Sequence, residues 1–111
     1  MCIFCKIANK EIPAKVVFED EHVLAFHDVN PQAPTHVLII PKRHIAGIGD
    51  AAPEDEAVLG RLLLAARRVA ELTGVAERGF RTVVNHGANA GQTVFHLHVH
   101  VIGGRAMAWP P

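Results

Sequence analysis

The chain has 111 residues, eleven basic and eleven acidic side chains, and a hydrophobic fraction of 50%. That length corresponds to a single domain over residues 1–111, and that composition excludes a disordered chain. The balanced charge gives no electrostatic basis for nucleic acid as the main partner, and no apolar run is long enough for a membrane span. Because the N-terminus also lacks a signal-peptide pattern, we expect a cytoplasmic protein with reduced cysteines.

The first half of the chain predicts one short helix and three strands. Apolar residues on one side predict a helix over residues 3–8. Strands over 16–18 and 23–27, separated by an acidic turn, suggest a hairpin. The two prolines of the segment 30–34 make it a loop. The β-branched and apolar residues of 36–40 predict a buried central strand, which Pro41 ends.

The second half contains one long helix and two further strands. Apolar residues at three- and four-residue steps predict a helix over 53–73. A strand over 80–84, a loop over 85–93 and a strand over 95–102 follow, and the tail runs over 105–111. One long helix beside about five strands in hairpin-like succession favours the α+β class. We therefore expect an antiparallel sheet that the helix covers on one face.

Three alternating histidines mark the last strand. Side chains alternate between the two faces of a strand, so His96, His98 and His100 share one face, and Leu97 and Val99 share the core face. A row of imidazoles binds a metal, or it forms a hydrogen-bonded relay around one nucleophilic nitrogen. Spacing by itself does not separate a metal triad from a nucleophile.

The loop before this strand favours phosphoryl chemistry. Gly91 lets the backbone approach a ligand closely, and successive amides of Gly91-Gln92-Thr93 are able to form an anion-binding nest. Thr93 adds a hydroxyl group, and Asn85 adds an amide at the end of the previous strand. A phosphate-binding loop beside three histidines therefore indicates a reaction at phosphorus.

These residues resemble the histidine triad (HIT) family. The segment His96-Leu97-His98-Val99-His100-Val101-Ile102 matches its His-x-His-x-His motif, with apolar residues between and after the histidines. Further segments resemble the Hint branch, the purine nucleoside phosphoramidases, over nearly the whole chain: Glu11 to Lys15, Ala25 to His36, Ile40 to Ile45, Val83 to Asn85, and the tail from Gly103 to Pro111.

The resemblance implies a HIT-like fold and a homodimer in which two protomers join their sheets. It also implies hydrolysis of purine nucleoside 5′-phosphoramidates or aminoacyl adenylates to nucleoside monophosphates. In the family pattern, His98 attacks the α-phosphorus and forms a covalent nucleotidyl-histidine that water resolves, without a cofactor. Imidazole suits this task because much of it is unprotonated near neutral pH.

The resemblance also assigns the surrounding residues. His96, His100 and His44 accompany His98 in the catalytic region, and Thr93 lies near the leaving group, where a serine is commoner. Asp28 matches the acidic residue that binds the ribose hydroxyls. The purine site comprises Ile3, Phe4, Ile7, Ile12, Phe26, His27 and Val29; the phosphate contacts are Asn85, Gly91, Gln92 and Thr93, together with His98 and His100; and Trp109 reaches the active site of the partner subunit.

Cys2 and Cys5 have the spacing of half a zinc site. Some bacterial members of the family complete such a site with the histidines that correspond to His44 and His96. The alternative is a pair of small, inert thiols at the start of a helix. Any zinc at this site would be structural and would leave His98 free.

Three alternatives to the phosphoramidase remain open at the level of sequence. They are a dinucleoside polyphosphate hydrolase, a nucleotide-binding regulator with little catalysis, and a zinc hydrolase that uses the three triad histidines as ligands. His22, His36 and His86 receive no functional assignment from the sequence, although His86 lies beside the predicted phosphate loop.

Overall fold

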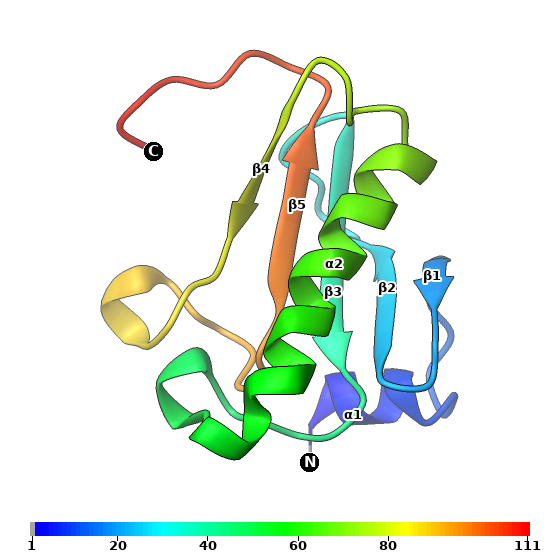
Figure 1. The fold of residues 1–111 in the computed structure, drawn as a ribbon, viewed down its shortest axis with the longest axis vertical. Helices are drawn as coiled ribbons and strands as arrows, with labels where there is room; N and C mark the ends of the chain where they lie inside the picture. Colours follow the sequence, from blue (N-terminus) through cyan, green and yellow to red (C-terminus); the bar gives the residue numbers. More distant parts are fainter. Residues whose placement is uncertain (1) are drawn as a thin grey trace.

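The structure is a computed structural model that describes residues 2–111. It has the predicted α+β architecture, with one antiparallel five-stranded sheet in the order β1-β2-β3-β5-β4 (Figure 1). The elements in chain order are α1 (Ile3–Ala8), β1 (Val16–Glu19), β2 (Val23–His27), β3 (Thr35–Pro41), α2 (Glu56–Leu72), β4 (Phe80–Val83) and β5 (Val99–Gly103).

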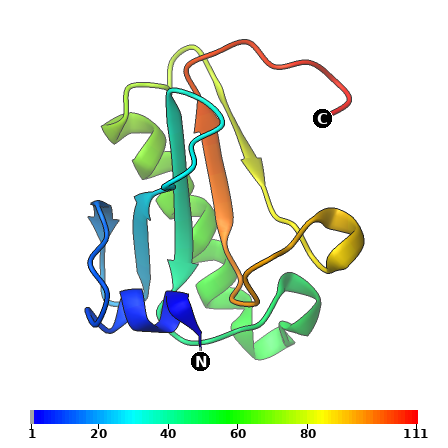
Figure 2. The same ribbon diagram turned by 180° about the vertical axis from the view of Figure 1, so that it is seen from behind.

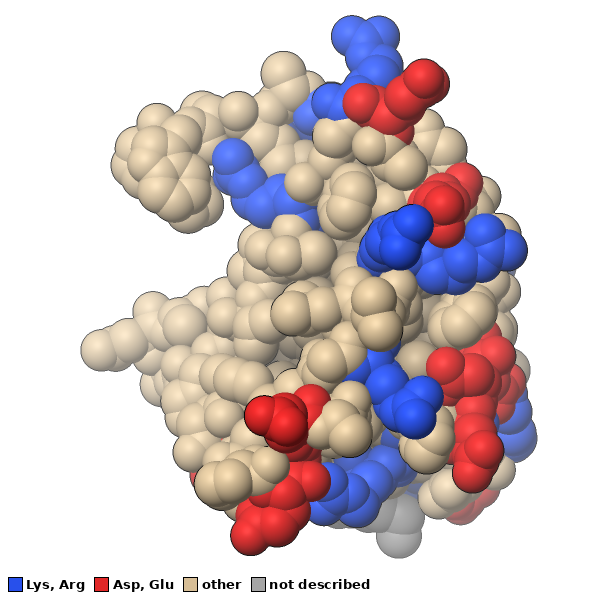
Figure 3. Space-filling model, in the orientation of Figure 1, with Lys and Arg blue, Asp and Glu red and all other residues tan. Residues whose placement is uncertain are grey.

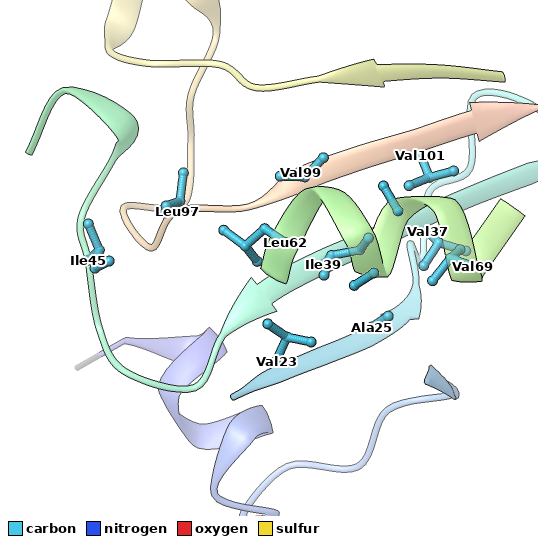
Figure 4. Close-up of a cluster of buried hydrophobic side chains, with 12 residues drawn as sticks. Val23, Ala25, Val37, Ile39, Ile45, Leu62, Val69, Leu97, Val99 and Val101 are labelled. Atoms are coloured by element: carbon cyan, nitrogen blue, oxygen red, sulfur yellow. The ribbon is translucent and has the colours of Figure 1, made fainter. Parts of the chain in front are cut away.

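The main core lies between the sheet and α2. Leu62 and Val69 of α2 face Ala25 on β2 and Val37 and Ile39 on β3, and all five side chains are buried (Figure 4). These helix positions belong to the apolar stripe of the sequence, which explains why α2 lies along the sheet. The helix fixes β2, β3 and β5, the three strands that line the cavity described below.

The opposite face of the sheet is covered in part by α1, which crosses one end of it (Figure 2). Phe4 and Ile7 of this helix form a second buried cluster with residues of β2 and β3, including Phe26 and Leu38. The rings of Phe4 and Phe26 make an edge-to-face contact, with centroids 5.5 Å apart. This second core places α1 on the face from which the triad histidines project.

The last strand is shorter than predicted, because β5 begins at Val99 rather than at residue 95. Its partner β3 ends at Pro41, and a proline has no amide hydrogen to continue a ladder. The amide of Leu97 donates instead to the carbonyl of Ile45, at 2.6 Å. The predicted alternation persists without the ladder, since Leu97 and Val99 are buried in the main core.

The long helix also begins later than predicted. The segment Pro53–Asp55 forms a 3₁₀ turn, and α2 starts at Glu56. The Asp55 carboxylate accepts from the amide of Ala52 at 2.8 Å and from the guanidinium of Arg43. The start of α2 is thus tied to the residue next to His44. Neither α-helix of the described chain combines the length and the apolar character that a bilayer span requires.

Candidate active site

A cavity of about 1160 Å³ opens between α1, β2 and the segment that carries His98 and His100. That volume accommodates a nucleoside monophosphate and a leaving group. All seven residues expected at the purine site line it, as do Asp28, Thr93, His98 and His100. Its apolar part comes from α1, the segment that follows α1, and β2. The structure therefore gathers most of the predicted nucleotide site around one space.

His98 lies at the wall of this cavity with one ring nitrogen engaged. Its Nδ1 donates to the backbone carbonyl of His96 at 2.7 Å, and the edge of the ring contacts Phe4, with centroids 5.3 Å apart. Since Nδ1 carries the proton, the lone pair of a neutral ring lies on Nε2. The Nε2 atom forms no hydrogen bond within residues 2–111, so it is available to a substrate.

His100 is oriented by His36, which sequence analysis left unassigned. The amide of Gln32 donates to His36 Nδ1 at 3.0 Å, and His36 Nε2 lies 2.8 Å from His100 Nδ1. The first hydrogen bond places the proton of a neutral His36 on Nε2, which then donates to His100. The chain of donors leaves His100 with an N–H at Nε2, and this buried atom has no hydrogen-bond partner among residues 2–111.

The hydrogen bonds from Gln32 through His36 to His100 require both histidine rings to be neutral, and the surroundings of His100 favour its neutral form. Burial, followed by the neighbouring His98 and His36, lowers the pKa of His100 to about 4, while Asp28 opposes the shift. His100 is consequently uncharged at neutral pH. An uncharged imidazole with an unpartnered N–H beside the cavity is a hydrogen-bond donor suited to an oxygen of a bound phosphate.

Asp28 is a turn residue whose side chain also lines the cavity. One carboxylate oxygen accepts from the amide of Asn30 at 2.8 Å, as in a turn residue. The other lies 3.4 Å from His36 Nε2, and the side chain lines the cavity. The turn fixes the carboxylate at the cavity wall, and its contact with ribose hydroxyls stays a prediction.

Gln92 holds the predicted phosphate loop together. Its side-chain oxygen accepts from the amide of Gly87, and its nitrogen donates to the carbonyls of Ala46 and Val94, at 2.9 to 3.1 Å. Its backbone amide donates to the Gly87 carbonyl, and that of Gly91 donates to Ala88. These two amides are therefore not free for a phosphate, contrary to the expected anion nest. The loop's own carbonyls compete for the same donors.

His86 anchors the same loop to a neighbouring turn. Its Nδ1 accepts from the amide of Gly49 at 3.1 Å, and the ring occupies the space where side chains at Gly47 and Gly49 would lie. The ring therefore packs against a turn that only glycines can form at this distance. The structure thus gives His86, which sequence analysis left unassigned, a positioning contact.

Other predicted contacts lie away from the cavity in this chain. Thr93 lines the cavity, but Asn85, Gly91 and Gln92 do not. Trp109 is 81% exposed in the C-terminal tail, where the Arg81 guanidinium lies 6.0 Å from its ring centroid. The role of Trp109 at the active site of a partner subunit stays a prediction.

The second predicted site is a compact group of four possible metal ligands, Cys2, Cys5, His44 and His96. His96 Nδ1 lies 3.3 Å from the Cys2 sulfur, 3.5 Å from the Cys5 sulfur and 3.2 Å from His44 Nδ1, and Cys5 lies 3.3 Å from His44. Bond lengths of about 2.0 Å to nitrogen and 2.3 Å to sulfur place tetrahedral zinc ligands roughly 3.3 to 3.8 Å apart. The observed separations therefore fit a zinc ion.

The environment of His96 also fits a metal ligand. Its Nε2 donates to the Pro41 carbonyl at 2.8 Å, which turns the Nδ1 lone pair toward the cysteines. Burial is the main cause that lowers the pKa of His96, so the ring is held neutral. Burial and the nearby Cys2 thiol raise the pKa of Cys5, so binding of a metal would displace a proton.

The three triad histidines do not converge on one point. The ring of His96 faces the cysteines, Nδ1 of His98 binds a carbonyl, and Nδ1 of His100 accepts from His36. A zinc hydrolase with these three rings as ligands is therefore contradicted by the geometry. A third grouping, Asp28, His36 and His100, brings possible ligand atoms together, but Nε2 of His36 carries the proton that it donates to His100 and is not free for a metal.

Comparisons with known proteins agree with this geometry. The HIT domain family matches residues 9–107. An uncharacterised HIT-like protein of Synechocystis sp. is 57% identical over 109 residues, 98% of this chain and 95% of that protein. The Adenylylsulfatase HINT1 of Arabidopsis thaliana is 53% identical over 111 residues, 98% of this chain and 75% of that protein.

A solved structure extends the agreement to the fold. A HIT family hydrolase from Legionella pneumophila superposes with a TM-score of 0.97 at 53% identity, and the match covers 100% of this chain and 99% of that one. The triad, the cavity and these relatives point the same way. The chain belongs to the HIT domain family and groups with its hydrolases.

Proposed function

We propose that the protein hydrolyses purine nucleoside 5′-phosphoramidates, or aminoacyl adenylates, to nucleoside monophosphates. The observation that carries the proposal is the state of His98, whose Nδ1 donates to the His96 carbonyl at 2.7 Å while its Nε2 is unengaged. A neutral imidazole fixed in this tautomer at a cavity wall is a prepared nucleophile. The sequence relationship to a Hint-branch relative supports the substrate class.

The reaction would proceed in two displacements at phosphorus. His98 Nε2 forms a bond to the α-phosphorus, and the phosphorus–nitrogen bond to the amine breaks. The amine leaves with a proton, for which the hydroxyl of Thr93 in the same cavity is a candidate donor. Water then attacks phosphorus, the bond to His98 breaks, and the nucleoside monophosphate is released. The N–H of His100 would bind a phosphate oxygen throughout.

The first test of this function is the variant His98→Gly. It removes the nucleophile, so turnover of adenosine 5′-phosphoramidate should fall by at least about 1,000-fold while folding is retained. Mass spectrometry of rapidly quenched wild-type protein should detect an added nucleotidyl group on His98. The control is His22→Gly, since the ring of His22 forms no hydrogen bond in the described chain. Full turnover by His98→Gly would overturn the proposal.

Two other hydrolytic reactions compete with this assignment. A dinucleoside polyphosphate hydrolase would use the same nucleophile with a nucleotide as the leaving group. The name of the Arabidopsis relative indicates adenylyl sulfate as a further candidate. Comparing kcat/KM for a phosphoramidate, an aminoacyl adenylate, adenylyl sulfate and diadenosine polyphosphates on one preparation ranks these substrates. Nucleotide binding with negligible turnover of all four would favour the regulator.

We further propose that Cys2, Cys5, His44 and His96 bind one structural zinc ion per chain. The support is the donor set of two sulfurs and two nitrogens, together with their separations. A bound zinc would join the start of α1 to His44, before α2, and to His96, before β5. No catalytic step is assigned to it. Metal analysis of untagged protein should find about one zinc per chain, and near-zero zinc would contradict the site.

The edge of the sheet at β4 supports the homodimer that the family resemblance implies. Strand β4 pairs only with β5 in the described sheet, and Phe80 on β4 and Val84 directly after it are exposed. Figure 3 shows few charged side chains near this edge and the projecting tail, whereas charges gather over the rest of the view. We propose that β4 joins a second copy of the chain here.

A further inference from the structure

His96 connects the two cysteines, Cys2 and Cys5, with the proposed nucleophile His98. Its ring is fully buried, with Nδ1 3.3 Å from the Cys2 sulfur. Its backbone carbonyl accepts the Nδ1 proton of His98 at 2.7 Å. One residue therefore contributes its side chain to the proposed metal site and its carbonyl to the orientation of the nucleophile.

Few hydrogen bonds hold this part of the backbone, while the Leu97 side chain anchors it in the main core. Residues 95–98 precede β5 and lie outside the regular ladder. Their neighbouring attachments are the Leu97 amide, which donates to Ile45, and His96 Nε2, which donates to Pro41. The contacts of His96 Nδ1 with the two sulfurs add to these attachments and to the packing of His96 on Phe4, and together they fix the carbonyl that His98 uses.

The two cysteines are placed to react with each other. The Cys2 sulfur accepts from the Cys5 amide at 3.3 Å at the start of α1, and all four ligand atoms lie within 4.8 Å of one another. Alpha-carbons three residues apart in a helical turn are roughly 5 to 6 Å apart, within the range that a disulfide spans. These are also the only two cysteines of the chain.

We propose that Cys2 and Cys5 form a peroxide-sensitive disulfide site that controls the orientation of His98 through His96. The inference rests on the proposed zinc site and on His98 as the nucleophile. Oxidation removes both sulfur ligands from the cluster. The His96 ring then loses its two sulfur contacts at Nδ1 and keeps the hydrogen bond from Nε2 to Pro41, so the ring shifts and the carbonyl that accepts from His98 moves with it.

The oxidation balances with hydrogen peroxide as the oxidant. Two thiolates, one peroxide and two protons give one disulfide and two water molecules, while zinc is released without a change of charge. The thiolates lose two electrons, and the peroxide gains them. A thiol reductant with added zinc reverses the step. In metal sites, loss of a partner that orients a ligand costs about 10- to 100-fold in activity, and we expect a fall of that order when the partner that orients His98 moves.

The experiment treats zinc-loaded, reduced wild-type protein with hydrogen peroxide and follows four quantities. A chromogenic indicator measures released zinc, and alkylation with mass analysis measures the disulfide. Proton–nitrogen NMR follows the Nδ1–H resonance of His98, and turnover of adenosine 5′-phosphoramidate follows activity. We expect one zinc released per disulfide, a shifted or broadened His98 resonance, and the stated loss of turnover.

Controls separate the thiol reaction from other damage. Dithiothreitol with zinc should restore all four quantities, whereas methionine sulfoxide is not reduced by this treatment. In Cys2→Ser/Cys5→Ser, peroxide should leave the His98 resonance unchanged. A disulfide that forms without any change at His98 or in turnover would overturn the inference, as would zinc that remains bound after oxidation. If reduced protein turns over no phosphoramidate, the proposed function fails, while the zinc and NMR results still decide the inference.

Discussion

At the scale of single residues, the site depends on which ring nitrogen carries a proton. The His96 carbonyl fixes the tautomer of His98, and the chain from the Gln32 amide through His36 fixes that of His100. Both choices come from backbone groups, which do not change protonation state near neutral pH. The result is one imidazole with an unengaged Nε2 lone pair and one with an unengaged Nε2–H in the described chain, although the two rings lie only 5.0 Å apart.

The buried state of His100 makes stability depend on pH. Its pKa in the folded protein is about 4, below the ordinary value near 6.5. Between those values the unfolded chain binds more protons, so the stabilisation is complete above about pH 6.5 and is lost as the pH falls toward 4. NMR titration should place the His100 midpoint near 4. Urea denaturation should show that the free energy of unfolding falls less between pH 7 and pH 5 for His100→Asn than for the wild type.

A His100 midpoint near 6.5 in the NMR titration would contradict this prediction. So would equal losses of stability in the variant and the wild type. Retained folding of His100→Asn at pH 7 should be checked by circular dichroism, because the substitution also removes the acceptor for His36.

At the scale of elements, the site lies where separate segments are joined by side chains. Gln92 connects the loop before Thr93 to Ala46, and His86 connects the start of that loop to Gly49. Asp55 connects the start of α2 to Arg43, the neighbour of His44. The cavity wall is therefore fixed by cross-links between loops as well as by the sheet. Such contacts restrict local opening of a site.

The contact between His86 and Gly49 can be tested by a double-mutant cycle. A Cβ at Gly49 would lie 2.7 Å from the His86 ring, and His86→Ala removes that ring. Each single substitution, His86→Ala or Gly49→Ala, should lower the free energy of unfolding by about 1 kcal/mol and reduce kcat more than it changes KM. Because both break one contact, the double variant should lose clearly less than the sum.

The matched control for this cycle is Gly60→Ala on α2, where a Cβ meets no atom within 4 Å. This substitution should leave turnover unchanged and raise helix stability by roughly 0.5 to 1 kcal/mol. Additive losses in the double variant, or unchanged kcat in both single variants, would show that the His86 contact does not position the loop.

At the scale of the whole molecule, different elements cover the two faces of the sheet. Helix α2 and the main core cover one face, while α1, the cavity and the cysteine cluster occupy the other (Figures 1 and 2). The β4 edge and the C-terminal tail lie to one side of both. This arrangement leaves β4 accessible for pairing while α1 covers the histidines.

The proposed dimer predicts a specific effect of charge at this edge. Val84 is 39% exposed and follows β4 directly. Val84→Glu in both copies would place like charges at a joined edge, so the mass from light scattering should fall from two chains to one. Glu77→Gln, on the exposed segment before β4, is the control and should remain dimeric. A monomeric wild type would contradict the proposal, as would a Val84→Glu variant that is still a dimer.

Much of the fold could be predicted because it depends on local patterns. The apolar stripe of α2 and the alternation around Leu97 report directly which side chains face the core. The HIT assignment was likewise readable from the His-x-His-x-His motif and is confirmed. Predictions were weaker where a partner from another segment decides the outcome. Pro41 shortened β5, and loop carbonyls took the amides of Gly91 and Gln92.

The sequence by itself determined the fold class, the family, and which histidines share a side of the chain, because these follow from periodicity and motif spacing. Only the tertiary structure decided which partner each histidine ring contacts. His36 is 64 residues from His100 and orients it, and Cys2 is 94 residues from His96 and contacts it. Hydrogen bonds between such distant residues depend on strand register and helix placement, which one-dimensional patterns do not specify.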